Sequence, residues 1–179
     1  RKILPPLVLL VCLFGFGNIQ AQNALDLDGV DDFVQTTCPG VLGSNARTVE
    51  AWIKTTANCN PNTGGVQQVI ADWGSFVTGG RFTFNVLWAN AIRIEVGGNG
   101  LSGTIPVNDG NWHHVAFTTT ASAQVLYFDG VSVATASNTF TNASSSDSSF
   151  IVDYASFDGE MDEVAIWNSV LSAAQVRAI

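Results

Sequence analysis

Hydrophobic and polar residues alternate along several short stretches of the chain. Residues 48–56 read TVEAWIKTT, in which every second residue from Val49 to Ile53 is apolar. The same period recurs in residues 81–88 and 91–96, which only a short interval separates. Successive side chains of a β-strand point to opposite faces, so this period predicts strands with one buried face. The interval between the last two segments predicts a hairpin.

Segments of this kind follow one another along nearly the whole chain. We count about a dozen, at spacings near ten residues, separated by turns rich in Gly, Asn, Asp and Ser. Nothing between them has the period of a helix, so an α/β fold is not expected. The pattern predicts an all-β protein, an antiparallel sandwich of two sheets in one domain.

The closing segment, residues 157–179, carries the most informative pattern. It begins with an Asp-Gly turn and continues as a strand-like alternation. Ser172 and Gln175 then have the spacing of a capping box, which predicts one short helix over residues 173–179. We therefore expect a last strand followed by one or two helical turns.

Residues 1–21 have the pattern of a secretory signal peptide. Arg1 and Lys2 form a basic start, residues 7–16 are apolar, and Ala21 suits cleavage after it. The apolar run is shorter than the roughly 20 residues that a transmembrane helix needs. We expect a secreted protein, extracellular or at the cell surface, without a membrane span.

The chain is acidic overall. Its formal charge of −8 arises from 7 basic and 15 acidic side chains. The charge becomes −10 if Arg1 and Lys2 leave with the signal peptide. Such a surface repels phosphate backbones, so nucleic acid is not expected as a partner. Neutral sugars are tolerated and cations are favoured.

The cysteines suggest a disulfide. If Cys12 leaves with the signal peptide, Cys38 and Cys59 remain. An even pair in an exported chain favours a disulfide over a metal site, because zinc would need two further ligands nearby. The alternative is a pair of free thiols.

Five segments resemble, in the expected order, the signatures of one family. They are residues 24–34 (ALDLDGVDDFV), 48–55 (TVEAWIKT), 111–118 (NWHHVAFT), 126–131 (LYFDGV) and 157–176. Together they resemble the laminin-G-like domains of the concanavalin A-like lectin and glucanase superfamily, and more distantly the pentraxins. The resemblance implies a jelly-roll sandwich over residues 22–179. It also implies binding of carbohydrate or protein partners, often within a larger extracellular protein, and calcium in some members.

Acidic residues gather in the first turn and in the closing segment. Calcium takes oxygen ligands from loops, with carbonyls and waters completing its shell. The first and last strands of a jelly roll are often neighbours, so the two acidic groups could meet. We expect Asp28, Asp32 and Asp162 to be the calcium ligands. The alternative is that these acids are turn formers and solvated edge charges.

The candidates for sugar binding are aromatic. Sugars stack their apolar faces on aromatic rings, while amides and carboxylates bind the hydroxyls. Trp73 and Trp88 border loops, and Asn90 follows Trp88. We predict that these three residues contact the ligand and that most other tryptophans are core. Periodicity does not tell which face of a strand is solvated.

A catalytic role is not expected. Glucanases of this superfamily place carboxylates at alternate positions of one strand. Here Glu160 and Asp162 would share a face, but the next alternate position is Val164. Glu163 points to the other face unless a bulge intervenes. A retaining glycosidase needs two carboxyl groups about 5–5.5 Å apart, and this pattern supplies no such second group.

The two histidines are not expected to form a metal site. His113 and His114 are adjacent on a predicted strand, so their side chains diverge and cannot share one metal. One is expected inside the sandwich and the other exposed. No serine lies in a Gly-x-Ser-x-Gly elbow.

Three functions remain open. The first is non-catalytic binding of an extracellular polysaccharide or other glycan. The second is adhesion to a surface protein, or a structural appendage. The third, glucanase activity, needs a second carboxylate facing Glu160.

Overall fold

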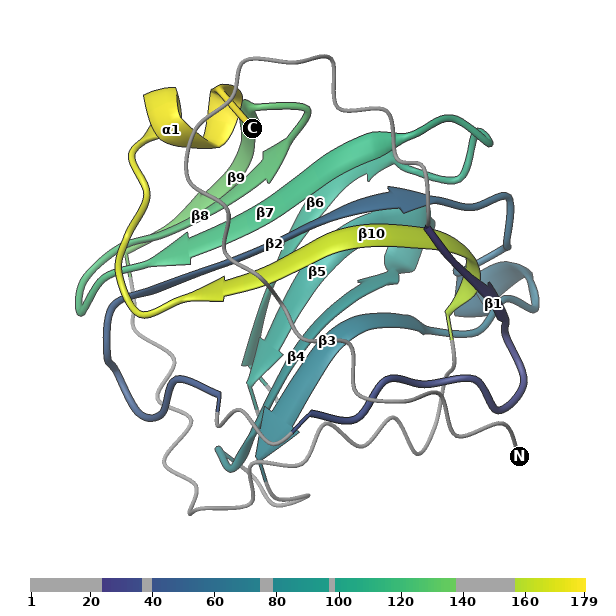
Figure 1. The fold of residues 1–179 in the computed structure, drawn as a ribbon, viewed down its shortest axis with the longest axis horizontal. Helices are drawn as coiled ribbons and strands as arrows, with labels where there is room; N and C mark the ends of the chain where they lie inside the picture. The colour runs from purple at the N-terminus through teal and green to yellow at the C-terminus, as the bar shows by residue number, and fades with distance from the viewer. Residues whose placement is uncertain (1–23, 37–39, 75–78, 97–98, 138–156) are drawn as a thin grey trace.

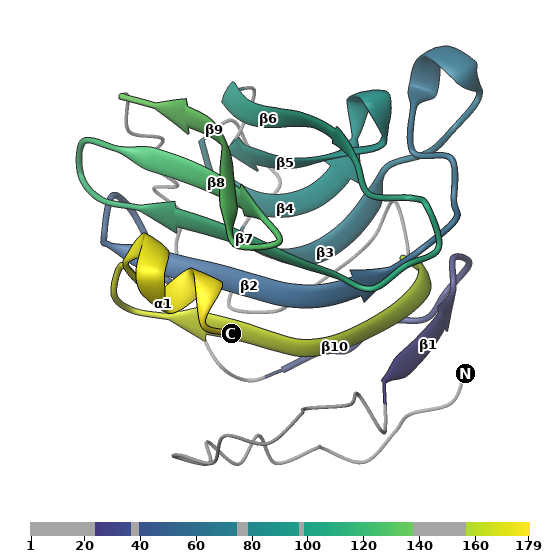
Figure 2. The ribbon, with the colours of Figure 1, turned by 90° about the horizontal axis from the view of Figure 1, so that it is seen from above.

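The computed structural model describes residues 24–36, 40–74, 79–96, 99–137 and 157–179. These residues form two antiparallel sheets packed face to face, with one short helix (Figures 1 and 2). The sheet orders are β1-β10-β2-β7-β8-β9 and β3-β4-β5-β6. The elements are β1 (Leu25–Asp28), β2 (Arg47–Lys54), η1 (Pro61–Thr63), β3 (Gln68–Gly74), β4 (Arg81–Leu87), η2 (Trp88–Asn90), β5 (Ala91–Val96), β6 (Asn99–Pro106), β7 (His113–Thr119), β8 (Gln124–Phe128), β9 (Val131–Ala136), β10 (Asp158–Trp167) and α1 (Ala173–Arg177).

This architecture confirms the predicted all-β sandwich. β4 and β5 pair as an antiparallel hairpin through η2, as the spacing of their segments predicted. Asp129 and Gly130 both have positive φ and close the β8–β9 hairpin, the backbone that an Asp-Gly turn favours. The expected signal peptide, residues 1–21, lies outside the described residues. None of the helices among the described residues is long and apolar enough to span a membrane.

The core lies between the two sheets and is built from alternate residues of both. Its largest inward side chains come from central strands, because these are covered by a neighbour on each side. They include Val49, Ile53, Trp73, Phe82, Phe84, Ile92, Ile94, Phe117 and Leu126. Burying such side chains contributes about 1.5–3 kcal/mol each. The outer face of each sheet is therefore left outside this core.

A β-bulge interrupts β10 at Glu163. Asp162 pairs with Trp52 of β2, whereas Ala165 pairs with Glu50, so two residues of β10 oppose one residue of β2. Glu163 has φ of 48°, in the left-handed region that a residue with a Cβ rarely adopts. A bulge of this kind bends the strand and shifts the alternation beyond it.

The bulge corrects the predicted faces of the closing strand. The sequence pattern placed Asp162 on one face with Val164 and Ile166. In the structure Val164 and Ile166 pack against the core, whereas Asp162 lies beside Trp52 on the outer face of the six-stranded sheet. The prediction failed because strict alternation cannot include the extra residue.

α1 packs on the outer face of the same sheet. Ser172 and Gln175 form the predicted capping box, each accepting a hydrogen bond from the backbone of the other. Leu171 and Val176 are buried in a small cluster with Ala116 of β7 and Tyr127 of β8. The helix thus covers only one end of this face (Figure 1).

Candidate functional site

Several loops gather at one end of the sandwich. In both views the tip of β1 and the turns η1 and η2 lie toward this end (Figures 1 and 2). Hydrogen bonds join the loops: the Cys59 N–H donates to Asn90 Oδ1 at 2.7 Å. The Gly110 N–H donates to the carbonyl of Thr55 at 3.1 Å, and Thr55 Oγ1 donates to the carbonyl of Asp158 at 2.6 Å. We call this end, with the turn after β1 and η2, the loop end.

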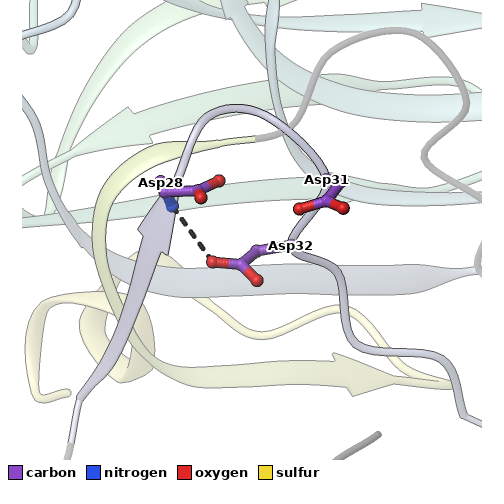
Figure 3. A group of neighbouring side chains, drawn as sticks. All are labelled: Asp28, Asp31 and Asp32. Atoms are coloured by element: carbon purple, nitrogen blue, oxygen red, sulfur yellow. Dashed lines mark hydrogen bonds between the residues drawn. The ribbon is translucent and has the colours of Figure 1, made fainter. Parts of the chain in front are cut away.

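Three carboxylates converge in the turn after β1. One oxygen from each of Asp28, Asp31 and Asp32 lies within 4.8 Å of the others, and all three side chains are exposed (Figure 3). Local hydrogen bonds set this geometry: Val30 N–H donates to Asp28 Oδ1 at 2.9 Å. Asp28 N–H donates to Asp32 Oδ2 at 3.2 Å. Three carboxylate oxygens at this spacing are hard ligands that suit calcium.

The predicted metal residues are only partly brought together. Asp28 and Asp32 belong to the group, and Asp31 joins them. Asp162 does not, because β10 pairs with β1 so that Asp158, and not Asp162, lies opposite Asp28. Four residues of strand separate the two positions, roughly 13 Å. The sequence could have indicated Asp31 as a member of this group, since three aspartates fall within the five residues from 28 to 32.

Trp73 is a core residue, which corrects the prediction that it contacts ligand. Its side chain is 0% exposed, and its ring stacks on Phe82 at 3.9 Å between centroids. Its indole N–H donates to the carbonyl of Val41 at 3.2 Å. Bordering a loop in sequence did not expose this residue, because its position in β3 points inward.

Trp88 is exposed at the loop end, as predicted, with 46% of its surface accessible. The next two residues, Ala89 and Asn90, have φ of 59°. Asn90 fixes this turn: its carbonyl accepts from the Val107 N–H at 2.9 Å, and its Oδ1 accepts from Cys59. The structure therefore gives Asn90 a scaffold role and leaves Trp88 as the accessible ring.

Cys59 is a buried thiol beneath the loop end. Burial, and then the charge of Asp158, raises the pKa of the Cys59 thiol to about 12, so the reactive thiolate is suppressed. Its Sγ donates to the carbonyl of Ala57 at 3.5 Å. Cys38 lies outside the described residues, and the pairing of Cys38 with Cys59 stays a prediction.

The two histidines diverge as predicted, but the expectation of one histidine inside the sandwich and one exposed was wrong, because His113 is only partly exposed. His114 points to the outer face of the six-stranded sheet and is nevertheless only 3% exposed. His113 lies between the carboxylates of Asp109 and Asp129. A polar side chain can therefore be buried on the outer face of the sheet as well as in the core of the sandwich.

Glu160, Asp162 and Glu163 of β10 do not join the aspartate group of the loop end. Glu160 forms an ion pair with Lys54, at 2.6 Å between Oε1 and Nζ. Burial, and then the charges of Asp162 and Glu50, raises the pKa of Glu163. The bulge therefore brings Glu163 toward Glu50, which strict alternation would have kept apart.

The comparisons with known proteins agree with this fold. Residues 28–177 match the family model described as the concanavalin A-like lectin/glucanases superfamily, Laminin_G_3. The chain belongs to this family. No protein among the curated sequences matches the chain.

Solved structures with the same fold include a pentraxin and two domains that were solved with a bound sugar. The pentraxin of Limulus polyphemus, heptameric and SAP-like, has 16% identity over 85% of this chain and 78% of its own, with a TM-score of 0.59. The CBM40 of the Ruminococcus gnavus IT-sialidase, bound to α2,3-sialyllactose, has 15% identity over 81% of this chain and 97% of its own, with a TM-score of 0.59.

Domain 4 of AbnA, a GH43 extracellular arabinanase from Geobacillus stearothermophilus in complex with arabinotriose, has 21% identity over 78% of this chain and 69% of its own, with a TM-score of 0.56. A match in a longer Bacteroides ovatus protein covers 43% of that chain. At these identities the likeness establishes the fold alone.

Proposed function

We propose that this laminin-G-like domain is a secreted, non-catalytic carbohydrate-binding module of a larger extracellular protein. The observation that carries the proposal is an exposed indole, Trp88, on a turn held in place by hydrogen bonds at the loop end. A turn fixed in advance loses little conformational freedom when a sugar stacks on the ring that it carries. Sugar-bound structures of the same fold support this interpretation.

Calcium is part of the proposal. Asp28, Asp31 and Asp32 would hold the ion in the turn after β1, with waters and carbonyls completing the coordination. A bound cation would offset the repulsion among the three carboxylates and stabilise the turn.

Replacing Trp88 tests the proposed function. We expect Trp88→Ala to weaken binding to the wild-type protein's best polysaccharide at least tenfold, because the stacking surface is lost. Trp88→Phe should retain most of it. Affinity electrophoresis in gels containing glucan, xylan, mannan or arabinan measures the change, with circular dichroism as the control for folding. Unchanged migration of Trp88→Ala in a gel that retards the wild-type protein would contradict the role of Trp88.

The non-catalytic part of the proposal is tested in the same samples. Glu160 is engaged by Lys54, and the second acid, Glu163, comes from a bulge. We expect no increase of reducing ends after prolonged incubation with the polysaccharide that binds. Release of reducing ends that disappears in Glu163→Gln would establish a hydrolase instead.

Adhesion to a protein is the second candidate, and an apolar stretch beside the acidic turn favours it. Val30, Phe33 and Val34 are all exposed, at 77%, 50% and 48%. Exposed apolar groups that lie together are typical of protein-binding surfaces. A folded sample that binds no glycan would favour this second candidate.

A further inference from the structure

Three of the five tryptophans lie on the outer face of the six-stranded sheet. Trp52 is on β2, Trp112 immediately precedes β7, and Trp167 ends β10. Trp52 and Trp112 are half-buried, and Trp167 is 40% exposed. Large aromatic side chains in a sandwich are expected to fill its core, where only Trp73 lies among the described tryptophans. We call this outer surface the tryptophan face.

The register places a carboxylate and a histidine beside the ring of Trp52. Trp52 lies between Asp162 of β10 and His114 of β7, and its ring centroid is 5.5 Å from that of His114. Lys54 lies over the ring of Trp112, with Nζ 6.0 Å from the centroid. Aromatic rings beside carboxylates are the combination that binds sugar rings and their hydroxyls.

Beneath the rings is a polar pair that local packing leaves incompletely satisfied. Trp167 Nε1 donates to Glu50 Oε1 at 2.9 Å. Glu50 Oε2 and His114 Nε2 are 3.5 Å apart, and neither atom makes a hydrogen bond in the described part of the chain. Both residues are buried. The two atoms face each other at ion-pair distance, but a buried polar atom without a hydrogen bond costs about 1–3 kcal/mol, so stability alone does not account for the pair.

The bulge at Glu163 is a second feature that stability does not explain. The left-handed backbone of a residue with a Cβ costs about 1–2 kcal/mol. The bulge places Asp162 on the tryptophan face, and Asp162 Oδ1 accepts a hydrogen bond from the Glu163 N–H at 2.8 Å. Strained backbone concentrates at functional sites. The strain and the polar pair occur on the same face, beside Trp52 and Trp167.

We propose that the tryptophan face is a second binding surface, for an internal segment of a neutral polysaccharide. Trp52, Trp112 and Trp167 provide the stacking surfaces, and the carboxylates of Asp162 and Glu163 accept hydrogen bonds from sugar hydroxyls. The proposal rests on the carbohydrate-binding function inferred above and names a second surface for it.

Charge and shape select this class of ligand. Four acidic side chains lie on this part of β2 and β10, Glu50, Glu160, Asp162 and Glu163, with Lys54 paired to Glu160. Uronic acids and sulfated sugars would be repelled. β2 and β10 bow away from the four-stranded sheet, so the backbone of this face is convex (Figure 2). An extended chain can lie across such a surface.

The tryptophan face is separate from the Trp88 turn. Trp88 follows β4 in the four-stranded sheet, whereas Trp52 and Trp167 lie in strands of the six-stranded sheet and Trp112 immediately precedes β7 of that sheet. Substitutions on one surface therefore leave the other intact, and each serves as a control for the other.

The test compares three variants of the whole protein by affinity electrophoresis, in gels with neutral glucan, xylan, mannan or arabinan and with anionic polygalacturonate. We expect Trp112→Ala to weaken retardation by a neutral polysaccharide at least tenfold. Glu163→Gly should weaken it about threefold while raising the melting temperature by about 2 °C, because glycine relieves the positive φ. Trp88→Ala, which removes the loop-end ring instead, should weaken retardation as well, because the two surfaces contribute separately.

The outcomes separate the two proposals. Binding by the wild-type protein that Trp88→Ala abolishes, and that Trp112→Ala and Glu163→Gly leave unchanged, would overturn the second surface and keep the proposed function. Absence of binding by the folded wild-type protein to every polysaccharide would overturn both. Stronger retardation by polygalacturonate than by the neutral polymers would overturn the choice of ligand. If Trp112→Ala does not fold, Glu163→Gly decides.

Discussion

His113 is held between two carboxylates. Its Nδ1 is 2.9 Å from Asp129 Oδ2, and its Nε2 is 3.0 Å from Asp109 Oδ1. Both ring nitrogens donate at once only in the protonated ring. Burial lowers the pKa of His113, but the hydrogen bonds and charges of Asp129 and Asp109 outweigh it and raise the pKa above 6.5. Hydrogen bonds from Asn111, and then from His113, lower the pKa of Asp109 to about 2.

These shifts make stability depend on pH. A raised histidine pKa stabilises the fold below the unfolded value of about 6.5, and this contribution is lost as the pH rises through the folded pKa. We expect the free energy of unfolding of the wild-type protein to decrease as the pH rises above about 6.5. His113→Asn should remove most of this slope. Urea unfolding across the range measures both, and equal slopes in the two proteins would contradict the assignment.

The acidic turn makes a separate prediction about calcium. We expect calcium to raise the melting temperature of the wild-type protein, because Asp28, Asp31 and Asp32 offer converging oxygens. Asp31→Asn should abolish most of the rise, whereas Asp162→Asn, outside this group, should retain it. Scanning calorimetry with calcium and with chelator measures the effect. Equal calcium-induced changes in melting temperature in the wild-type protein and in Asp31→Asn would show that the turn is not the calcium site.

At the scale of elements, β10 determines which of its side chains face the core and which lie on the outer face of the six-stranded sheet. It lies between β1 and β2, begins at the Asp-Gly turn, and changes its facing at the bulge. The start of β10 requires glycine at position 159. Gly159 has φ of 141°, and a Cβ there would lie 2.2 Å from the carbonyl oxygen of Lys54. The sequence predicted the strand and its turn from alternation and the Asp-Gly pair. It could not predict the bulge, since Glu163 has no local signal for positive φ.

Substitution of Gly159 tests this close approach. We expect Gly159→Ala to lower the free energy of unfolding by about 3 kcal/mol, because the backbone of β2 would have to move. The matched control is Gly43→Ala, where φ is 63° and no atom lies within 4 Å of the added Cβ. That variant should lose only about 1 kcal/mol from backbone strain. Equal losses measured by urea unfolding would show that contact with Lys54 is unimportant.

At the scale of the whole molecule, the periodic features were the predictable ones. Two sheets, the β4–β5 hairpin and the capped helix follow from alternation and cap residues, which act locally. The site residues depend on which face of a strand becomes the core. Trp73 and Trp52 each lie in a strand, yet one is inside and the other outside. That choice is made by packing between distant strands, and the meeting of Asp28 with Asp158 depends on register that no local pattern contains.

The central claim is that this domain binds glycans without cleaving them. The most direct measurement is binding of the purified protein to a broad glycan array, once with calcium and once with chelator. The account predicts binding to neutral glycans that weakens in chelator, because the aspartate turn lies at the same end of the sandwich as Trp88. A folded protein that binds no glycan under either condition would contradict it.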